Sequence, residues 1–223
     1  MKQTVIIGDV HGSTYWQSIV NNNPNCYYIF LGDYLDPYED IDNIALIKNL
    51  QDIILFKKTH PDKVTLLLGN HDLHYFVEES LLCTRFNYGL APEISEIFRT
   101  NYHLFKFAHQ EDNCLFTHAG VVHSWFVDDF KGDFTKNIAG QLNNPAPEQL
   151  KPLFQCGFYR GGEVDKVGGI FWADIHELYE PLQGFTQIVG HNRVPDIKDT
   201  TVNGGRIIFC DCLFNKQFLK IEI

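Results

Sequence analysis

The sequence predicts a layered α/β fold with a mixed β-sheet, and three observations support this prediction. Short apolar runs that end in a small residue alternate with amphipathic helical segments through the first half of the chain. Residues 200–223 instead contain three short β-type runs separated by turn signals. The chain has 223 residues with 44% hydrophobic content, which suits one domain with a sizeable core.

The elements follow in chain order. Residues 3–9 are an apolar run that ends in Gly-Asp, which predicts a buried strand, and Ser13 is expected to cap a helix behind it. Further strands are predicted at 27–33, 63–70, 113–120 and 185–192, and helices at 40–58 and 92–108. The turn signals at Asn203-Gly204-Gly205 and around Asn215 predict an antiparallel meander at the end.

The stretch from about 121 to 168 has a different composition. It is rich in Pro, Asn and Gly, and its apolar periodicity is weak. We interpret it as a cap-like insertion with short helices inside a single domain that spans residues 1–223.

Charge and cysteine content restrict the partners. The 28 acidic residues outnumber the 18 basic ones, no Lys/Arg run occurs, and nucleic acid is therefore not expected as a partner. The six cysteines include no C-x-x-C pair, which argues against a zinc knuckle and for free thiols. The N-terminus turns polar too soon for a signal peptide, and no apolar run reaches a membrane span. We expect a cytoplasmic protein without a membrane partner.

Five predicted strands end in the same kind of residue. Their exits read GDVHG (8–12), GDYLD (32–36), GNHD (69–72), THAG (117–120) and VGHN (189–192). Any single Asp or Asn here could simply cap a helix, but histidine is a poor cap and occurs in four of the five. Ligands of α/β folds bind outside the carboxyl ends of strands. The five exits therefore predict one shared site.

The chemistry of these residues indicates metal binding. Carboxylate, amide oxygen and imidazole suit divalent ions such as Mn²⁺, Fe and Zn²⁺, and no thiolate is needed. Two ions need about six or seven ligands, including a bridging carboxylate between them.

The ordered motifs resemble the calcineurin-like metallophosphoesterases. Within that family they are similar to the phosphoprotein phosphatases and their small bacterial and phage relatives, of the serine/threonine phosphatase or dinucleoside tetraphosphatase type. The resemblance runs from Gly8 to about Asp211 and includes GIFWAD (169–174) and IIFCDC (207–212). It implies an α/β-β-α sandwich with mixed sheets and the active site at the strand ends.

The resemblance also implies a role for each motif residue. Two divalent ions, manganese first with iron or zinc as alternatives, would be held by Asp9 and His11 (first ion), Asp33 (bridge), and Asn70, His118 and His191 (second ion). The implied reaction is hydrolysis of a phosphomonoester by a metal-bridging hydroxide. His71 would be the general acid and Asp36 its partner, and we expect this carboxylate to raise the pKa of the imidazole.

Two positions depart from the family pattern. Phosphoprotein phosphatases have a phosphate-binding Arg where this chain has Pro37, so a bidentate clamp is missing. Arg160 resembles the second phosphate-binding Arg, which the resemblance places ahead of the Trp segment, and Arg193 follows GHN directly. Arg193 also replaces the second His of the G-H-x-H motif, which argues against nucleases and cyclic phosphodiesterases.

The sequence therefore predicts a metal-dependent phosphatase. Phosphorylated proteins, dinucleoside polyphosphates and small phosphate esters all remain open as substrates. A non-catalytic scaffold on the same fold is a further alternative, although such proteins usually lose ligand residues or the general acid, and this chain retains both.

Overall fold

The computed structural model describes residues 2–223, and its strands form two five-stranded mixed sheets. The first sheet has the order β10-β1-β2-β3-β4 and the second β5-β6-β7-β9-β8. The strand bounds are β1 Gln3–Ile7, β2 Tyr27–Phe30, β3 Val64–Leu67, β4 Phe105–Lys106, β5 Ala108–Glu111, β6 Cys114–Thr117, β7 Thr186–Arg193, β8 Lys198–Val202, β9 Gly205–Asp211 and β10 Leu219–Glu222. Strands β1 to β4 run parallel to one another, as do β6, β7 and β9.

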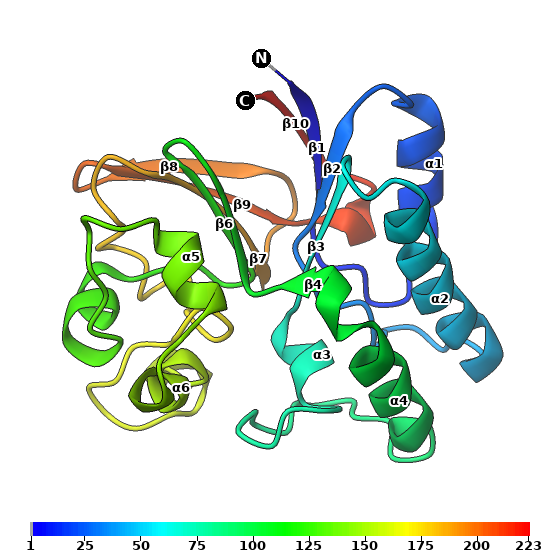
Figure 1. The fold of residues 1–223 in the computed structure, drawn as a ribbon, viewed down its shortest axis with the longest axis horizontal. Coiled ribbons are helices and arrows are strands. Elements are labelled where there is room, and N and C mark those ends of the chain that lie inside the picture. Colours follow the sequence, from blue (N-terminus) through cyan, green and yellow to red (C-terminus); the bar gives the residue numbers. More distant parts are fainter. Residues whose placement is uncertain (1) are drawn as a thin grey trace.

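The two sheets pack face to face with helical layers outside them (Figure 1). Alternation along β1 places Ile6 between the sheets, where it packs with Phe116 and Ile188, while Val5 and Ile7 point to the helical side. The helices are α1 Tyr15–Asn22, α2 Asn43–Thr59, α3 Asn70–Leu73, α4 Ala91–Asn101, α5 Ile138–Asn143 and α6 Pro147–Leu153. Helices α1, α2 and α4 lie on the side of the first sheet, and α5 and α6 on the side of the second. The predicted layered α/β class is confirmed.

Two local predictions need correction. Thr14, not Ser13, occupies the N-cap position of α1, and its side chain makes no capping bond, whereas Ser13 Oγ accepts a bond from the N–H of Tyr15, the first residue of the helix. The helix predicted at 92–108 ends at Asn101. Residues 105–106 instead form a strand that pairs with β3, and Ala108 begins a strand that pairs with β6, because this pairing outweighs the helical pattern that extends to residue 108.

The predicted C-terminal meander is only half right. Strands β8 and β9 form a hairpin through the turn at Asn203 and Gly204, both with positive φ. Strand β10 leaves the second sheet and pairs antiparallel with β1, so the two ends of the chain lie side by side (Figure 1).

Short helices occur in the stretch from 121 to 168. A π-helical turn at Trp125–Asp129 precedes α5 and α6, and a 3₁₀ turn follows at Phe158–Arg160. Trp125, Phe126 and Phe130 are fully buried there, so this stretch contributes to the main core.

Candidate metal centre and active site

The carboxyl ends of β1, β2, β3 and β6, together with the irregular end of β7, meet at one place. Because β1, β2 and β3 are neighbours in one sheet and β6 and β7 in the other, their exits lie along the seam between the sheets. The residues brought together are Asp9, His11, Asp33, Asp36, Asn70, His71, His118 and His191. The five strand exits thus form one cluster.

One group of potential metal ligands consists of Asp9, His11 and Asp33, whose ligand atoms lie within 4.8 Å of one another. His11 Nε2 lies 3.7 Å from Asp33 Oδ2 and 4.0 Å from Asp9 Oδ2. His11 Nδ1 donates to the Leu35 carbonyl at 2.7 Å. This bond fixes the tautomer and leaves the Nε2 lone pair facing the carboxylates, as a metal ligand requires.

A second group consists of Asp33, His118 and His191, with the Asn70 amide beside them. Asn70 Oδ1 lies 2.9 Å from His118 Nε2 and 3.0 Å from His191 Nδ1. His118 Nδ1 donates to the Leu31 carbonyl at 2.8 Å, so its Nε2 is again the lone-pair atom. Asp33 Oδ2 is 3.5 Å from that atom, so Asp33 belongs to both groups.

The electrostatics of the cluster favour cation binding. Burial lowers the pKa of His11 and of His118 to about 3, which keeps both imidazoles neutral. Burial, followed by the charges of neighbouring carboxylates, raises the pKa of Asp9 and Asp33 well above the usual range. Neutral imidazoles and crowded, buried carboxylates are the donor set that a divalent cation stabilises. The residues therefore fit the divalent ions that the motifs predict.

Backbone geometry at the strand exits is unusual. His11, Asp33, Asp36 and His191 have left-handed backbones, with φ between 42° and 59°. Only a few per cent of non-glycine residues adopt this region, and they cluster at functional sites. Gly190 is required for a different reason, since a Cβ there would collide with Asp9 Oδ1.

His71 and Asp36 form a buried pair next to the metal groups. His71 Nδ1 donates to Asp36 Oδ2 at 2.7 Å, which leaves His71 Nε2 as the atom able to pass a proton. The second carboxylate oxygen accepts a bond from the Tyr75 hydroxyl, and His74 Nε2 lies 2.9 Å from Oδ2. Burial raises the pKa of Asp36, but these hydrogen bonds outweigh it and the pKa lies below its ordinary value.

The expected direction of the His71 pKa shift is not found. Asp36 does raise the pKa of His71, as predicted, but burial lowers it more, and the resulting pKa is below the ordinary value. A negatively charged ligand near this imidazole would act in the opposite direction to burial.

Two further aspartates support the site. Asp72 is fully buried and accepts backbone N–H bonds from Gly69, Asp33 and Tyr34 at 2.8–2.9 Å. It therefore fixes the loop that carries Asp33. Burial raises the pKa of Asp211 to about 6, and its charge in turn raises the pKa of Asp9.

The two arginines suggested as phosphate ligands lie in different places. A cavity of about 300 Å³ contains residues of both metal groups together with Arg160. Arg160 is tied down there, with Nε 2.7 Å from Asp174 Oδ2 and Nη2 2.7 Å from Asn192 Oδ1. Arg193 is absent from the lining of this cavity and packs its guanidinium over the Tyr38 ring at 4.5 Å.

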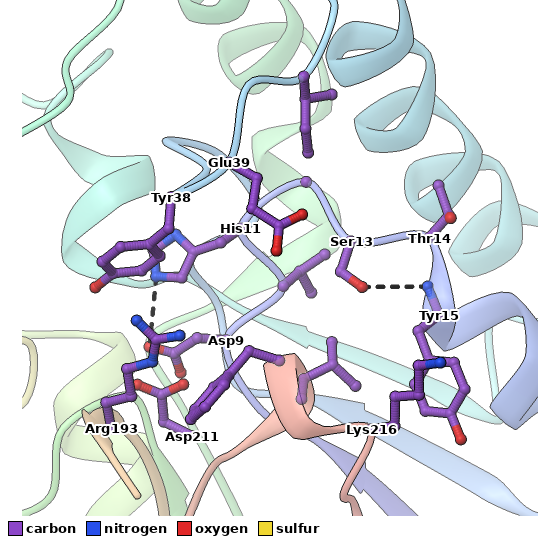
Figure 2. Close-up of a pocket in the computed structure, with 15 residues that line it drawn as sticks. Asp9, His11, Ser13, Thr14, Tyr15, Tyr38, Glu39, Arg193, Asp211 and Lys216 are labelled. Atoms are coloured by element: carbon purple, nitrogen blue, oxygen red, sulfur yellow. Dashed lines mark hydrogen bonds and ion pairs between the residues drawn. The ribbon is translucent and has the colours of Figure 1, made fainter. Parts of the chain in front are cut away.

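Arg193 lines an adjoining cavity of about 450 Å³. Figure 2 shows this cavity, with Tyr38 and Arg193 on one side and Tyr15 and Lys216 on the other. The two cavities share the lining residues Asp9, His11, Tyr38 and Asp211.

Sequence reasoning missed several residues around the site. His74, Tyr75 and Arg85 are not among the predicted site residues, yet His74 and Tyr75 contact the Asp36 carboxylate and Arg85 donates to the Asp36 main-chain carbonyl. The spacing His71–Tyr75 is i, i+4, which could have placed both side chains on one side of the turn. No comparable pattern marks Arg85, since it lies in an irregular loop.

Among residues 2–223, no helix combines the length and the apolar content needed to cross a bilayer.

Comparisons with known proteins agree on the family. Residues 3–178 match the family model described as calcineurin-like phosphoesterase. Among curated proteins, a protein phosphatase 2A catalytic subunit from Dictyostelium discoideum is 38% identical over 72 residues, 30% of this chain and 21% of the relative. The serine/threonine-protein phosphatase ppe1 of Schizosaccharomyces pombe is 35% identical over 72 residues, again 30% of this chain and 22% of the relative. The matched segment thus spans about a fifth of each relative's length.

Solved structures show the same fold at low sequence identity. A serine/threonine phosphatase from Saccharomyces cerevisiae with similarity to human phosphatase PP5 has a TM-score of 0.57 at 14% identity, covering 94% of this chain and 67% of that one. A cold-active protein tyrosine phosphatase has a TM-score of 0.59 at 16% identity, covering 100% of this chain and 74% of that one.

Proposed function

Because this chain belongs to the calcineurin-like phosphoesterase family, we propose that it is a metal-dependent phosphatase that hydrolyses phosphomonoesters at a dinuclear centre. The observation that carries the proposal is the position of Asp33. Its carboxylate is shared by two groups of ligands, and both groups direct imidazole lone pairs towards it.

We assign the ligands in two sets around this shared carboxylate. The proposed ligands are Asp9 and His11 for one ion, Asn70, His118 and His191 for the other, and Asp33 for both. Manganese is our first choice, with iron and zinc as alternatives, because the set combines hard oxygen and borderline nitrogen donors. Two such ions, when bound, lower the pKa of a water molecule and neutralise charge on the phosphoryl group.

The protein side chains would supply the remaining chemistry. His71 Nε2 would give its proton to the departing oxygen, and Asp36 would hold the imidazole by its bond to Nδ1. A bound phosphate dianion would raise the pKa of His71 again and so load it with the proton. Arg160, fixed by Asp174, lines the same cavity and would bind the phosphoryl oxygens. Arg193 lines the adjoining cavity instead, so we assign it to a more distant part of the substrate than the phosphoryl group.

The adjoining cavity also favours a second candidate function. It is larger than the cavity that contains residues of both metal groups, it has Arg193 and Lys216 on its wall, and it shares Asp9 and His11 with that cavity. A dinucleoside polyphosphate would place a second charged group there. Hydrolysis of dinucleoside polyphosphates is therefore the alternative to phosphomonoester hydrolysis.

A substrate panel tests the proposal. The protein is stripped with a chelator, refilled with Mn²⁺, Zn²⁺ or Fe²⁺, and assayed with a phosphopeptide, a dinucleoside tetraphosphate and an aryl phosphate. We expect metal-dependent release of phosphate from the monoesters. Preference for the tetraphosphate would favour the alternative, and no turnover with any metal would support a non-catalytic scaffold.

A further inference from the structure

Arg85 lies beside the proposed general acid, although nothing in the sequence marks it. It comes from the loop between α3 and α4 and lines the cavity that contains residues of both metal groups. Its Nη2 is 3.5 Å from His71 Nε2, the ring atom that faces away from Asp36. The side chain thus brings a positive charge to the place where a leaving oxygen would sit.

The guanidinium is held by groups that leave its charge unneutralised. Nε donates to the Asp36 main-chain carbonyl at 2.9 Å, and the guanidinium carbon lies 3.7 Å from the centre of the Tyr38 ring. Within the described range 2–223, no carboxylate oxygen lies within 4.0 Å of this guanidinium, whereas Arg160 in the same cavity is paired with Asp174. A half-buried, unpaired guanidinium next to a cavity favours an anionic ligand.

The Arg85 side chain is also oriented by protein contacts before any ligand binds. Arg85 has φ 64°, a left-handed backbone that non-glycine residues adopt rarely, and Nη1 lies within 3.3 Å of the Thr84 hydroxyl. Three separate contacts, to Asp36, Tyr38 and Thr84, therefore fix the orientation of the guanidinium. A donor oriented in advance loses little entropy when it binds.

We propose that Arg85 binds the phosphoryl group of the substrate and supplies the guanidinium that is missing at position 37. This inference rests on the proposed phosphatase function. The acceptor of its Nε bond is the carbonyl of Asp36, the residue that directly precedes Pro37, so the guanidinium reaches this place from another loop. His71 and Arg85 can then contact two oxygens of one phosphate, His71 the leaving oxygen and Arg85 a non-bridging one.

The test measures binding of inorganic phosphate to the metal-loaded protein by isothermal titration calorimetry. The variants are Arg85→Gln, Arg85→Lys and the matched control Arg206→Gln, whose arginine pairs with Asp199 on the β8–β9 hairpin. We expect Arg85→Gln to weaken phosphate binding about 10- to 100-fold at unchanged metal content, Arg85→Lys to weaken it less, and the control to leave it unchanged.

A purely structural role makes a different prediction. It would lower the melting temperature or the metal content of Arg85→Gln and leave phosphate affinity per metal-loaded molecule within twofold of wild type, and that result would overturn the proposal. If Arg85→Gln does not fold, phosphate binding by Arg85→Lys tests the proposal in the same way, because lysine keeps the positive charge but lacks the planar guanidinium that can bind two oxygens at once.

The outcome is separable from that of the proposed function. Phosphate binding that depends on Arg85 in a protein that hydrolyses no ester would support this inference and refute the phosphatase proposal. Ester hydrolysis with phosphate binding indifferent to Arg85 would do the reverse. Failure of the metal-loaded wild type to bind phosphate at all would overturn the role of Arg85 as well.

Discussion

Replacing Asp36 by Asn is the most informative perturbation of the site. The Asp36 side chain is 1% exposed, and one of its oxygens accepts the His71 Nδ1 bond while the other accepts the Tyr75 hydroxyl. His74 adds a third polar contact to this carboxylate, because its Nδ1 accepts the Cys83 N–H and its proton must therefore be on Nε2. An Asn amide has the same shape but only one oxygen to accept these bonds.

The magnitude follows from the bond that is lost. A hydrogen bond to a charged group contributes about 1.5–3 kcal/mol, which corresponds to roughly 10- to 100-fold in rate if the bond orients the proton donor. The loss should be greatest with an alkyl phosphate such as a phosphoserine peptide, because an alkoxide leaves poorly without a proton. With an aryl phosphate, whose leaving group needs little help, kcat should fall much less.

The assay compares kcat for the two substrates at equal metal content. Tyr75→Phe is the matched control, because it removes a donor to the same carboxylate and leaves the His71 bond in place. We expect that control to stay within a few-fold of wild type on both substrates. Equal losses on alkyl and aryl phosphates in Asp36→Asn, or no loss at all, would refute the idea that Asp36 acts through His71.

Three other substitutions test the proposed general acid His71, the proposed bridging ligand Asp33 and the buried carboxyl group of Asp211. His71→Asn should lose most activity on poor leaving groups and little on an aryl phosphate, and a uniform loss would argue against proton donation. Asp33→Asn should halve or abolish the bound metal, measured by elemental analysis, so full metal content with full activity would exclude the bridge. In the metal-free protein, folded Asp211 keeps its proton up to a pKa of about 6, whereas the unfolded carboxyl has a pKa of about 3.9. Rising pH should therefore destabilise wild type relative to Asp211→Asn from about pH 4 to about pH 7, by about 3 kcal/mol in all, with little further change above pH 7. Urea unfolding at successive pH values measures the difference in free energy of unfolding between the two proteins. A difference that stays constant with pH would contradict this prediction.

Most of the site was predictable because each proposed ligand follows an apolar run. Asp9, Asp33, Asn70 and His118 come within three residues of the ends of β-strands whose pattern is plain in the sequence, and parallel neighbours in a sheet must end on the same side. The register of the strands then brings residues that are far apart in the chain to one seam.

The features that the sequence did not predict lie in an irregular loop or in segments that could pair with either sheet. Arg85 comes from a loop without periodicity, and only the tertiary contact to the Asp36 carbonyl shows where its side chain ends. Residues 105–108 continue the helical periodicity of the preceding segment, but the edges of both sheets were open to pairing with this part of the chain. Strand β10 could not be assigned to β1 from its own pattern, because either sheet would bury its apolar side.

The left-handed residues at the strand exits divide the motif into two kinds of position. At His11, Asp33, Asp36 and His191 the backbone itself favours Asp, Asn, His or Gly, because other side chains cost about 1 kcal/mol or more there. Asp9, Asn70, His71 and His118 have no positive φ, so nothing in their backbone requires a polar residue. A descendant that lost its chemistry would therefore keep half of this signature for conformational reasons alone. The identity of residues 9, 70, 71 and 118 is the better criterion for deciding which members of such a lineage retain the proposed chemistry.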